Sequence, residues 1–221
     1  MKSVGTVLAT AARSVPEESR DRIIDTAIAL IASHGLAGMS LQMLADEVGL
    51  HKSTLFHHFR SKADVGDQAL FRVLEPLAQM VERLDTDSAP EIGQLIEVSH
   101  ALADHFVTAR HAALFLLRCM IGRDAFDRPG QPQDEDLQHP FWRIFLVLGG
   151  WLDRARRAGA IRRVRVRQAL INLLGMVLLY PAIADDFGRD VIAADPLSDR
   201  AHRARKEELA ATVRGAFAPL G

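Results

Sequence analysis

Basic and hydroxyl side chains gather in a short stretch, residues 48–63, that contains no acidic residue. Lys52, Arg60 and Lys62 supply positive charge there, among serine, threonine and three histidines. Such side chains donate hydrogen bonds to phosphate oxygens and to the edges of bases. Because the whole chain has a formal net charge of only −1, any binding of nucleic acid must come from a local patch of this kind.

Two short helices joined at a glycine would present this stretch to a partner. An inward apolar stripe at i, i+3, i+4 and i+7 predicts the first helix, capped by Ser40 and ended by Gly49. This stripe consists of Leu41, Leu44, Ala45 and Val48. The second helix is expected at about 51–59, with Leu55 and Phe59 turned inward. Its opposite face carries Ser53, Phe56, His57 and Arg60. The pair has the form of a helix-turn-helix.

Other chemistry is poorly supported by the residue spacing. His57 and His58 are adjacent, so they diverge by roughly 100° on a helix, and His51 lies about two turns away. That is not the spacing of metal ligands, and no metal or cofactor is expected. The chain lacks a glycine-rich phosphate loop, a nucleophile elbow and paired cysteine ligands. We therefore do not expect an enzyme.

Apolar residues recur at helical spacing along nearly the whole chain, and no stretch alternates at period two for long. The prediction is an all-α protein of about nine helices. We expect a flexible N-terminal arm at 1–18, a helix-turn-helix DNA-binding domain at 19–63, and a helical ligand-binding and dimerisation domain at 64–221. With one cysteine there is no internal disulfide, which favours a reducing, cytoplasmic location. The most apolar stretch, residues 169–184, is too short to favour a membrane span.

The stretch "RIIDTAIALIASHGLAGMSLQMLADEVGLHKSTLFHHFRSKADV" resembles the N-terminal domain of the TetR family of transcriptional regulators. The likeness follows the order first helix, Gly35, Ser40, Ala45, Gly49. It ends in a "TLYxHFxSK"-like signature formed by Thr54, Leu55, Phe56, His58, Phe59, Ser61 and Lys62. It covers roughly residues 20–65, and the remainder resembles the family only in length and helix order.

The resemblance implies which side chains would contact DNA. Lys52, Ser53 and His57 would reach base edges in the major groove. Ser40, Thr54 and Lys62 would hold phosphates, and Gln42 could do either. Two further residues are predicted to contact DNA, His51 and Phe56. Both depart from the family, which commonly has a small capping residue and a tyrosine at these positions.

The second domain offers weaker candidates. His100 and Asp104 lie four residues apart and could line the polar end of a pocket or form an exposed helix pair. Cys119 stands in apolar surroundings that favour a core role over redox sensing. The predicted pocket comprises His100, Asp104, Phe115, Cys119, Phe145, Trp151, Met176 and Tyr180. The helix expected at 167–187 is apolar nearly all round, so a second copy of the chain should cover part of it. The predicted dimer interface comprises Leu170, Leu174, Val177, Leu178, Leu209, Val213 and Phe217.

The leading hypothesis is a ligand-responsive DNA-binding regulator, most simply a repressor. It would bind a palindromic double-stranded operator as a homodimer and be released by a small, largely apolar effector. One alternative is a DNA-binding architectural or regulatory protein without a small-molecule ligand. A second is an enzyme built on helices, which would require a site invisible to motif analysis.

Phe56 generates a direct test. The family's tyrosine supplies a hydroxyl that commonly touches a DNA phosphate. We expect Phe56→Tyr to tighten operator binding by about 0.5 to 1.5 kcal/mol, the value of one hydrogen bond. Fluorescence anisotropy with a duplex selected by the wild-type protein measures the change. Unchanged affinity would mean that neighbouring side chains already replace the hydroxyl.

Overall fold

A computed structural model describes residues 15–84, 88–121, 138–184, 195–196 and 198–219. Within these ranges the chain forms nine helices and no strand, which confirms the predicted all-α fold. The helices are α1 (Val15–Gly38), α2 (Leu41–Val48), α3 (Lys52–His58), α4 (Lys62–Glu82), α5 (Ile92–Thr108), α6 (Arg110–Ile121), α7 (Pro140–Arg157), α8 (Val166–Ile183) and α10 (Asp199–Phe217).

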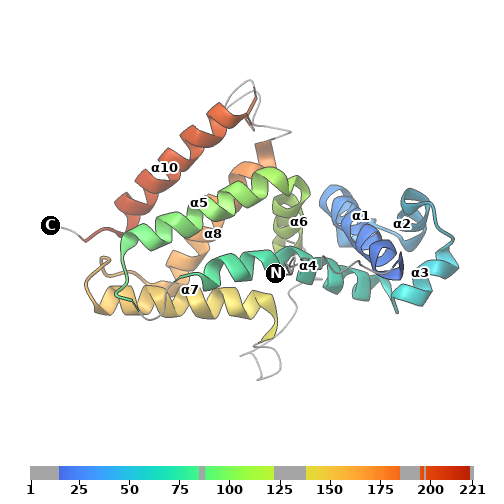
Figure 1. The fold of residues 1–221 in the computed structure, drawn as a ribbon, viewed down its shortest axis with the longest axis horizontal. Helices are drawn as coiled ribbons and strands as arrows, with labels where there is room; N and C mark the ends of the chain where they lie inside the picture. The colour runs from blue at the N-terminus through green and yellow to red at the C-terminus, as the bar shows by residue number, and fades with distance from the viewer. Residues whose placement is uncertain (1–14, 85–87, 122–137, 185–194, 197, 220–221) are drawn as a thin grey trace, which may run out of the picture.

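Helices α1 to α3 form one end of an elongated molecule, and α5, α7, α8 and α10 form the other (Figure 1). Helix α4 runs from the first group into the second, and α1 packs along α6. The sequence-based boundary at residue 63 thus falls at the first turn of α4. Residues 15–18, which we had assigned to a flexible arm, form the first turn of α1. Residues 1–14 lie outside the described residues.

Local signals in the sequence set the ends of the short helices. The Ser40 hydroxyl accepts a hydrogen bond from the Met43 backbone N–H at 3.0 Å, which caps α2. Gly49 closes α2 with φ +72°, a left-handed conformation that favours glycine. Gly35 has φ +72° as well, and the regular part of α1 ends there as predicted. The turn that leads into α3 is therefore specified by the sequence.

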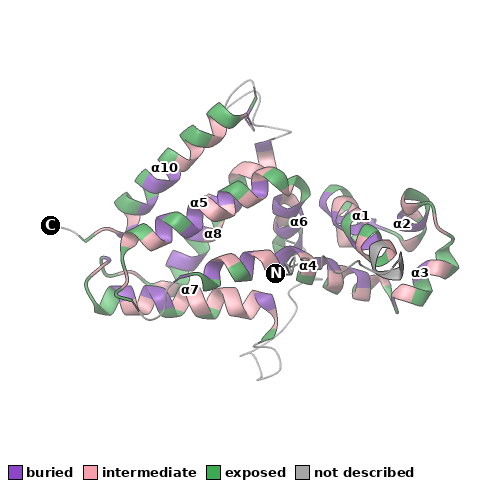
Figure 2. Ribbon diagram, in the orientation of Figure 1, coloured by how far each residue is buried: buried purple, intermediate pink, exposed green. Residues whose placement is uncertain are grey.

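The core divides into two clusters of buried side chains. One joins α1, α2 and α3 to α4, α6 and part of α8, and includes Leu44, Leu55 and Phe115. The other lies at the far end of the molecule around Trp151, which is fully buried. Figure 2 shows buried residues on the inward faces of the helices. Apolar packing is thus continuous from the helix-turn-helix into the second domain.

The predicted dimer interface needs correction. Six of its seven residues are buried within the chain, and Leu174 is half-buried against the same core. These six are Leu170, Val177, Leu178, Leu209, Val213 and Phe217. The sequence pattern marked their apolar stripe but could not tell which partner covers it. On α8, Ile171 and Leu179 are the exposed large apolar side chains.

Helix α8 is also the one described helix that is long and apolar enough to cross a membrane by length and composition. Buried core helices pass the same test. Here Leu173 and Val177 pack inside the protein, whereas Gln168 and Asn172 are exposed. Both observations fit a helix with one face in the core.

Candidate functional site

Helix α3 turns a mixed polar and aromatic face outward, and this reading face consists of Lys52, Ser53, Phe56 and His57. All four residues are exposed, and the Phe56 side chain is 52% accessible. On the other side, Leu55 and Phe59 are buried, as their spacing predicted. The reading face is therefore available to a large partner such as the major groove of DNA.

The other predicted DNA contacts lie around the reading face, and some of their hydrogen-bonding groups already have partners within the protein. His51 precedes α3 without capping it through its side chain, and its carbonyl accepts from the Thr54 N–H at 2.8 Å. Thr54 is half-buried. The Gln42 amide donates to Asp46 Oδ1 at 2.7 Å on the exposed surface of α2. Gln42 would have to leave this contact to donate the same N–H to a base.

Lys62 has a structural task that the sequence did not reveal. Its Nζ donates to the carbonyl oxygens of Ala37 at 3.0 Å and Met39 at 2.9 Å. The Ala37 carbonyl lies in the last turn of α1 and the Met39 carbonyl between α1 and α2, so the first residue of α4 is fastened to the helix-turn-helix. An ammonium has three donors, which leaves one for a phosphate. Phosphate contact by Lys62 stays a prediction, but in the free protein its main partners are backbone oxygens.

The junction at the start of α4 carries a second set of bonds. Asp64 accepts from the Arg60 backbone N–H at 2.7 Å and from the Gln68 amide at 2.6 Å. The hydrogen bond from the Arg60 backbone holds the pKa of the Asp64 carboxyl below its usual range. Since Ser61 caps the same helix end, the link between α3 and α4 is well ordered.

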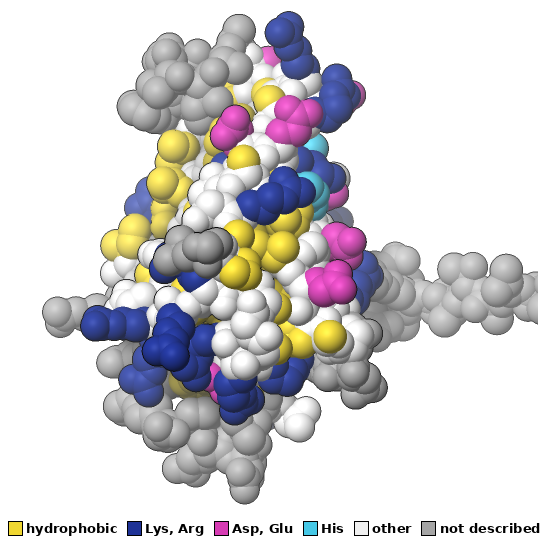
Figure 3. Space-filling model, turned by 90° about the vertical axis from the view of Figure 1, so that its left-hand side faces the viewer, with side chains coloured by type: hydrophobic (Ala, Val, Ile, Leu, Met, Phe, Trp, Pro, Cys, Tyr) yellow, Lys and Arg dark blue, Asp and Glu magenta, His cyan; other side chains and the backbone are white. Residues whose placement is uncertain are grey.

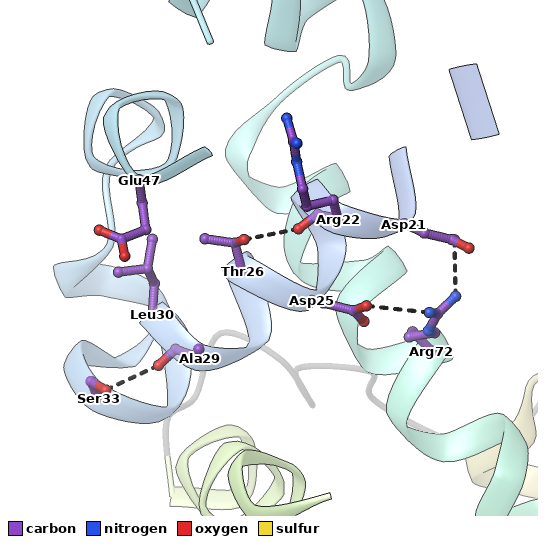
Figure 4. Close-up of a pocket in the computed structure, with 9 residues that line it drawn as sticks. All are labelled: Asp21, Arg22, Asp25, Thr26, Ala29, Leu30, Ser33, Glu47 and Arg72. Carbon is purple, nitrogen blue, oxygen red and sulfur yellow. Dashed lines mark hydrogen bonds and ion pairs between the residues drawn. The ribbon is translucent and has the colours of Figure 1, made fainter. Parts of the chain in front are cut away.

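Ion pairs extend this attachment along α4. Arg72 pairs with Asp21 at 2.9 Å and with Asp25 at 3.4 Å, both on α1. Figure 4 shows the three side chains together at one edge of a surface hollow between α1, α2 and α4. Because the pairs are partly exposed, each adds little stability. Their geometry nevertheless makes α1 and α4 move together.

An apolar cavity of about 330 Å³ lies in the second domain, beside α4. Helices α4 to α8 line it with Leu74, Leu77, Val81, Leu95, Val98, Ser99, Leu102, Phe106, Leu116, Met120, Phe141, Ile144, Phe145, Leu148, Leu170, Ile171, Leu173, Leu174, Val177 and Leu178. Ser99 is the one polar residue in this set, and its hydroxyl donates to the Leu95 carbonyl at 2.7 Å. None of its described lining residues is ionisable, so the cavity suits a neutral, apolar guest.

Of the eight residues of the predicted pocket, only Phe145 lines this cavity. His100 and Asp104 instead clasp α10: the His100 imidazole donates to the Lys206 carbonyl, and Asp104 bonds His202 and Lys206. The i, i+4 spacing placed them correctly on one helix face. It could not show that α10 covers that face.

The other predicted pocket residues occupy separate positions. Phe115 and Cys119 border a cavity of about 30 Å³ against α1 and α4, and burial raises the pKa of the Cys119 thiol to about 12. Trp151 is buried and donates to Gln94 Oε1 at 3.1 Å. Tyr180 donates to the Pro196 carbonyl at 3.0 Å. Met176 borders a groove beside α10. A neutral buried thiol fits the core role that we favoured for Cys119.

The cavity residues that sequence reasoning missed had a visible signal. Phe141, Ile144 and Leu148 repeat at helical spacing on α7, and Leu95, Leu102 and Phe106 do so on α5. Such stripes mark a core face, and a cavity within a core has the same composition as its filled parts. Only the relative placement of five helices distinguishes the two.

One ion-pair cluster joins a wall of the cavity to α4. Arg143 of α7 donates to both Glu82 carboxylate oxygens, at 2.8 and 2.9 Å, and to Glu75 at 2.7 Å. The Arg143 hydrogen bonds lower the pKa of the Glu82 carboxyl. A bidentate pair fixes orientation as well as distance. Helix α7 is thereby held to α4 beyond the cavity-lining residues. Within the described part of the chain, no cluster of histidine, cysteine or carboxylate side chains could hold a metal ion.

Known proteins resemble the chain in both domains. Residues 23–68 match the family model described as "Bacterial regulatory proteins, tetR family". The HTH-type transcriptional repressor KstR2 of Mycolicibacterium smegmatis is 28% identical over 106 residues, which cover 47% of this chain and 50% of the repressor. The chain therefore matches about half the length of this curated relative.

Two solved structures share the fold at lower identity. The ketosteroid transcriptional regulator KstR2 of Mycobacterium tuberculosis has a TM-score of 0.66 and 17% identity, over 97% of this chain and 100% of that one. The transcriptional regulator FadR of Bacillus subtilis, solved with stearoyl-CoA, has a TM-score of 0.60 and 17% identity, over 86% and 97%. The likeness thus extends beyond the helix-turn-helix into the second domain.

The two lysines of this site should separate binding from folding. We expect Lys52→Met to cost about 1 to 3 kcal/mol of DNA-binding free energy and to leave the free energy of unfolding unchanged, because its head group is exposed. Lys62→Met should lower the free energy of unfolding by about 1 to 3 kcal/mol, because two carbonyls lose a charged donor.

Urea denaturation at fixed protein concentration and anisotropy with a selected duplex measure both effects. The two substitutions remove equal charge, so each is a control for the other. Equal unfolding curves for the two variants would contradict the structural role of Lys62.

Proposed function

Because residues 23–68 match the family model of the bacterial tetR regulators, we propose that the chain is a homodimeric repressor of the TetR family whose hold on a palindromic operator is weakened by a small apolar effector. The observation that carries this proposal is the apolar cavity of about 330 Å³ against α4. Three α4 residues line it, Leu74, Leu77 and Val81. The same helix begins at the helix-turn-helix.

The lining of the cavity limits the effector to a neutral molecule or to the apolar part of a larger one. Burying an unpaired charge in the cavity would cost far more free energy than the apolar contacts of the effector would contribute. FadR of Bacillus subtilis, which shares the fold, was solved with stearoyl-CoA. A long acyl or polycyclic hydrocarbon group would suit the cavity of this chain, whereas a charged head group would have to lie outside it.

Helix α4 offers a mechanical path between effector and operator. At its far end, Arg143 fastens α4 to the cavity helix α7 through Glu82 and Glu75. At its near end, Lys62 fastens α4 to the turn that precedes α2. An effector that moves α7 and α4 apart from α8 would therefore carry the reading face with them. To act, it must bind the DNA-incompetent state more tightly, commonly by about 1 to 3 kcal/mol.

A homodimer would place two reading faces on one side of the duplex, about 34 to 36 Å apart. We propose that the exposed sides of α8 and α10 form its interface. Ile171 and Leu179 are exposed on α8, at 58% and 51%. The exposed side of α10 bears the small residues Ala204 and Ala211, which allow close helix contact. Such a repressor would act in the cytoplasm, where its operator lies.

The effector proposal predicts a defined response. A panel of neutral apolar molecules small enough for the cavity should contain a compound that raises the melting temperature and lowers operator affinity about 5- to 150-fold. Genomic fragments selected by the purified protein supply the operator, and differential scanning fluorimetry ranks the compounds.

Leu102→Trp should fill the cavity and abolish both effects, whereas operator binding remains. Exposed Leu146 provides a matched control, since Leu146→Trp adds the same side chain outside the cavity. Operator binding without any response to apolar compounds would instead favour a regulator that has no small-molecule ligand.

The Arg143 cluster provides a separate test of the path. Arg143→Met retains most of the side-chain stem but loses the pairs to Glu75 and Glu82. We expect an effector to bind this variant and to release DNA less, with the affinity change reduced about threefold or more. Titrations with effector, with DNA and with both together measure the coupling. Full coupling in a folded Arg143→Met variant would contradict the role of this cluster.

A further inference from the structure

A second basic region lies at the end of the molecule opposite the helix-turn-helix. Residues 154–184 contain seven arginines, no lysine and no acidic residue. The arginines follow one another from the end of α7 through the connection to the start of α8. We call the exposed group the distal arginine surface: Arg156, Arg157, Arg162, Arg163, Arg165 and Arg167. Figure 3 looks at this end, and Lys and Arg side chains gather over its lower half.

Three of these arginines have partners within the protein. Arg156 and Arg157 pair with Asp153 at 2.7 and 3.1 Å, and the hydrogen bond from Arg156 lowers the pKa of the Asp153 carboxyl. Arg162 donates to the Ala216 carbonyl near the C-terminal end of α10, where a cation is favoured. These contacts account for half of the surface by ordinary structural roles.

The side chains of the other three arginines have no such role. Arg163, Arg165 and Arg167 are exposed, and none of their guanidinium groups makes a hydrogen bond or ion pair within the described residues. They stand within five residues of one another in the sequence. Like charges this close repel each other unless an anion lies between them. Folding alone gives no reason to place them together.

Arg154, just before this group, adds an independent sign of missing negative charge. Its Nε and Nη2 atoms are buried and find no hydrogen-bond acceptor among the described residues. Buried polar atoms are nearly always hydrogen-bonded in folded proteins. An anion bound at this end of the molecule would offset part of the positive charge to which Arg154 contributes.

The start of α8 strengthens the attraction for anions. Arg165 is its N-cap residue, and its side chain does not cap the helix. The first backbone N–H groups of α8 therefore point outward, at the positive end of the helix dipole. A groove of about 640 Å³ begins here and runs along α8 to Ile171, which belongs to the proposed dimer interface. Its arginine end, bordered by Arg162, Arg163, Arg165 and Gln168, is the part offered to DNA, and all four side chains can donate hydrogen bonds.

We propose that the distal arginine surface binds the phosphate backbone of a second DNA segment. The guanidinium group suits phosphate because its planar donors match two oxygens at once. The arginines also spread over two helices and a connection, which fits an extended polyanion better than a single phosphate. This region and the reading face occupy opposite ends of the molecule (Figure 1), so one protein can hold two duplexes.

DNA is favoured over a membrane surface as the polyanion. Membrane-surface sites combine basic residues with exposed aromatic or long apolar anchors on one helix face. The exposed aromatic residues of the described chain, Phe56 and Phe71, lie on α3 and α4 and not at this end. Ile171 is the one exposed large apolar side chain beside the arginines, and the proposed dimer interface accounts for it. A regulator bound at one DNA site is also surrounded by DNA at high local concentration. The inference goes beyond the repressor proposal and requires neither an effector nor an operator.

The test removes the reading face first. In a Lys52→Ala, His57→Ala background, we would measure binding of a fluorescent duplex of arbitrary sequence by the full chain. The test variant adds Arg163→Gln, Arg165→Gln and Arg167→Gln. The matched control adds Arg72→Gln, Arg110→Gln and Arg118→Gln, three arginines on α4 and α6 that lie outside the proposed dimer interface. Both triple variants change the net charge equally.

We expect the background protein to bind the duplex with a strong salt dependence. The test variant should lose about tenfold or more in affinity, and its slope of log K against log salt should fall by about 2 to 3, the value for three phosphates. The matched control should bind like the background. With an intact reading face, the protein should also capture a second duplex on an immobilised first one, and the Arg163, Arg165, Arg167 substitutions should abolish this capture.

Four results would overturn the proposal. One is absence of duplex binding by the background protein at low salt, and another is an equal loss in the matched control. The third is binding to anionic lipid vesicles but not to DNA. The fourth is a change of oligomeric state by sedimentation in the test variant, which would place these arginines between two copies of the chain. Loss of operator recognition by Lys52→Ala, measured separately, reports on the reading face alone.

Discussion

The hold of Lys62 on the Ala37 and Met39 carbonyls is the constraint on which the arrangement of the two domains depends. Without it, the start of α4 would be held to the helix-turn-helix only by apolar packing and by the Asp64 and Arg72 contacts. With it, α4 belongs to both domains: its first turn is bonded to the helix-turn-helix, and its last turns line the cavity. An ammonium can serve in this way because carbonyl oxygens at the end of α1 are free to accept. A displacement of the first turn of α4 would therefore act directly on the end of α1 and the start of α2.

How much of this structure could be predicted from the sequence depends on how far apart along the chain the interacting residues lie. The helix-turn-helix could be predicted because Ser40 and Gly49 act on neighbours within four residues. The cavity could not, since its lining comes from five helices that have ordinary core stripes. His100 shows the difficulty most plainly, because its partner is the carbonyl of Lys206, 106 residues away. Helix α8 is apolar on opposite faces, so its pattern does not indicate which face meets the core.

The second domain contains both an apolar cavity and a dense group of positively charged arginines. Helix α8 passes from an end rich in arginine to a middle where Leu173 and Val177 face an apolar space. Ile171 borders both the cavity and the groove beside the arginines. A substitution on α8 can thus affect two surfaces at once. A change in DNA binding caused by a substitution near Ile171 can therefore arise from the cavity or from the groove.

The exposed aromatic ring of Phe56 has a consequence for the chemistry of the DNA sequence that this protein prefers. Without the hydroxyl that would hold it at a phosphate, the ring is free to turn into the major groove. A phenyl edge offers no hydrogen bond, so its favourable neighbour there is the C5 methyl group of thymine. A cytosine methylated at C5 carries the same group in the same position. At that one base step, the reading face would distinguish pyrimidines that carry a C5 methyl group from those that lack it. It would distinguish thymine from 5-methylcytosine less well. Methylation of the operator could then alter repression without any change in the encoded sequence.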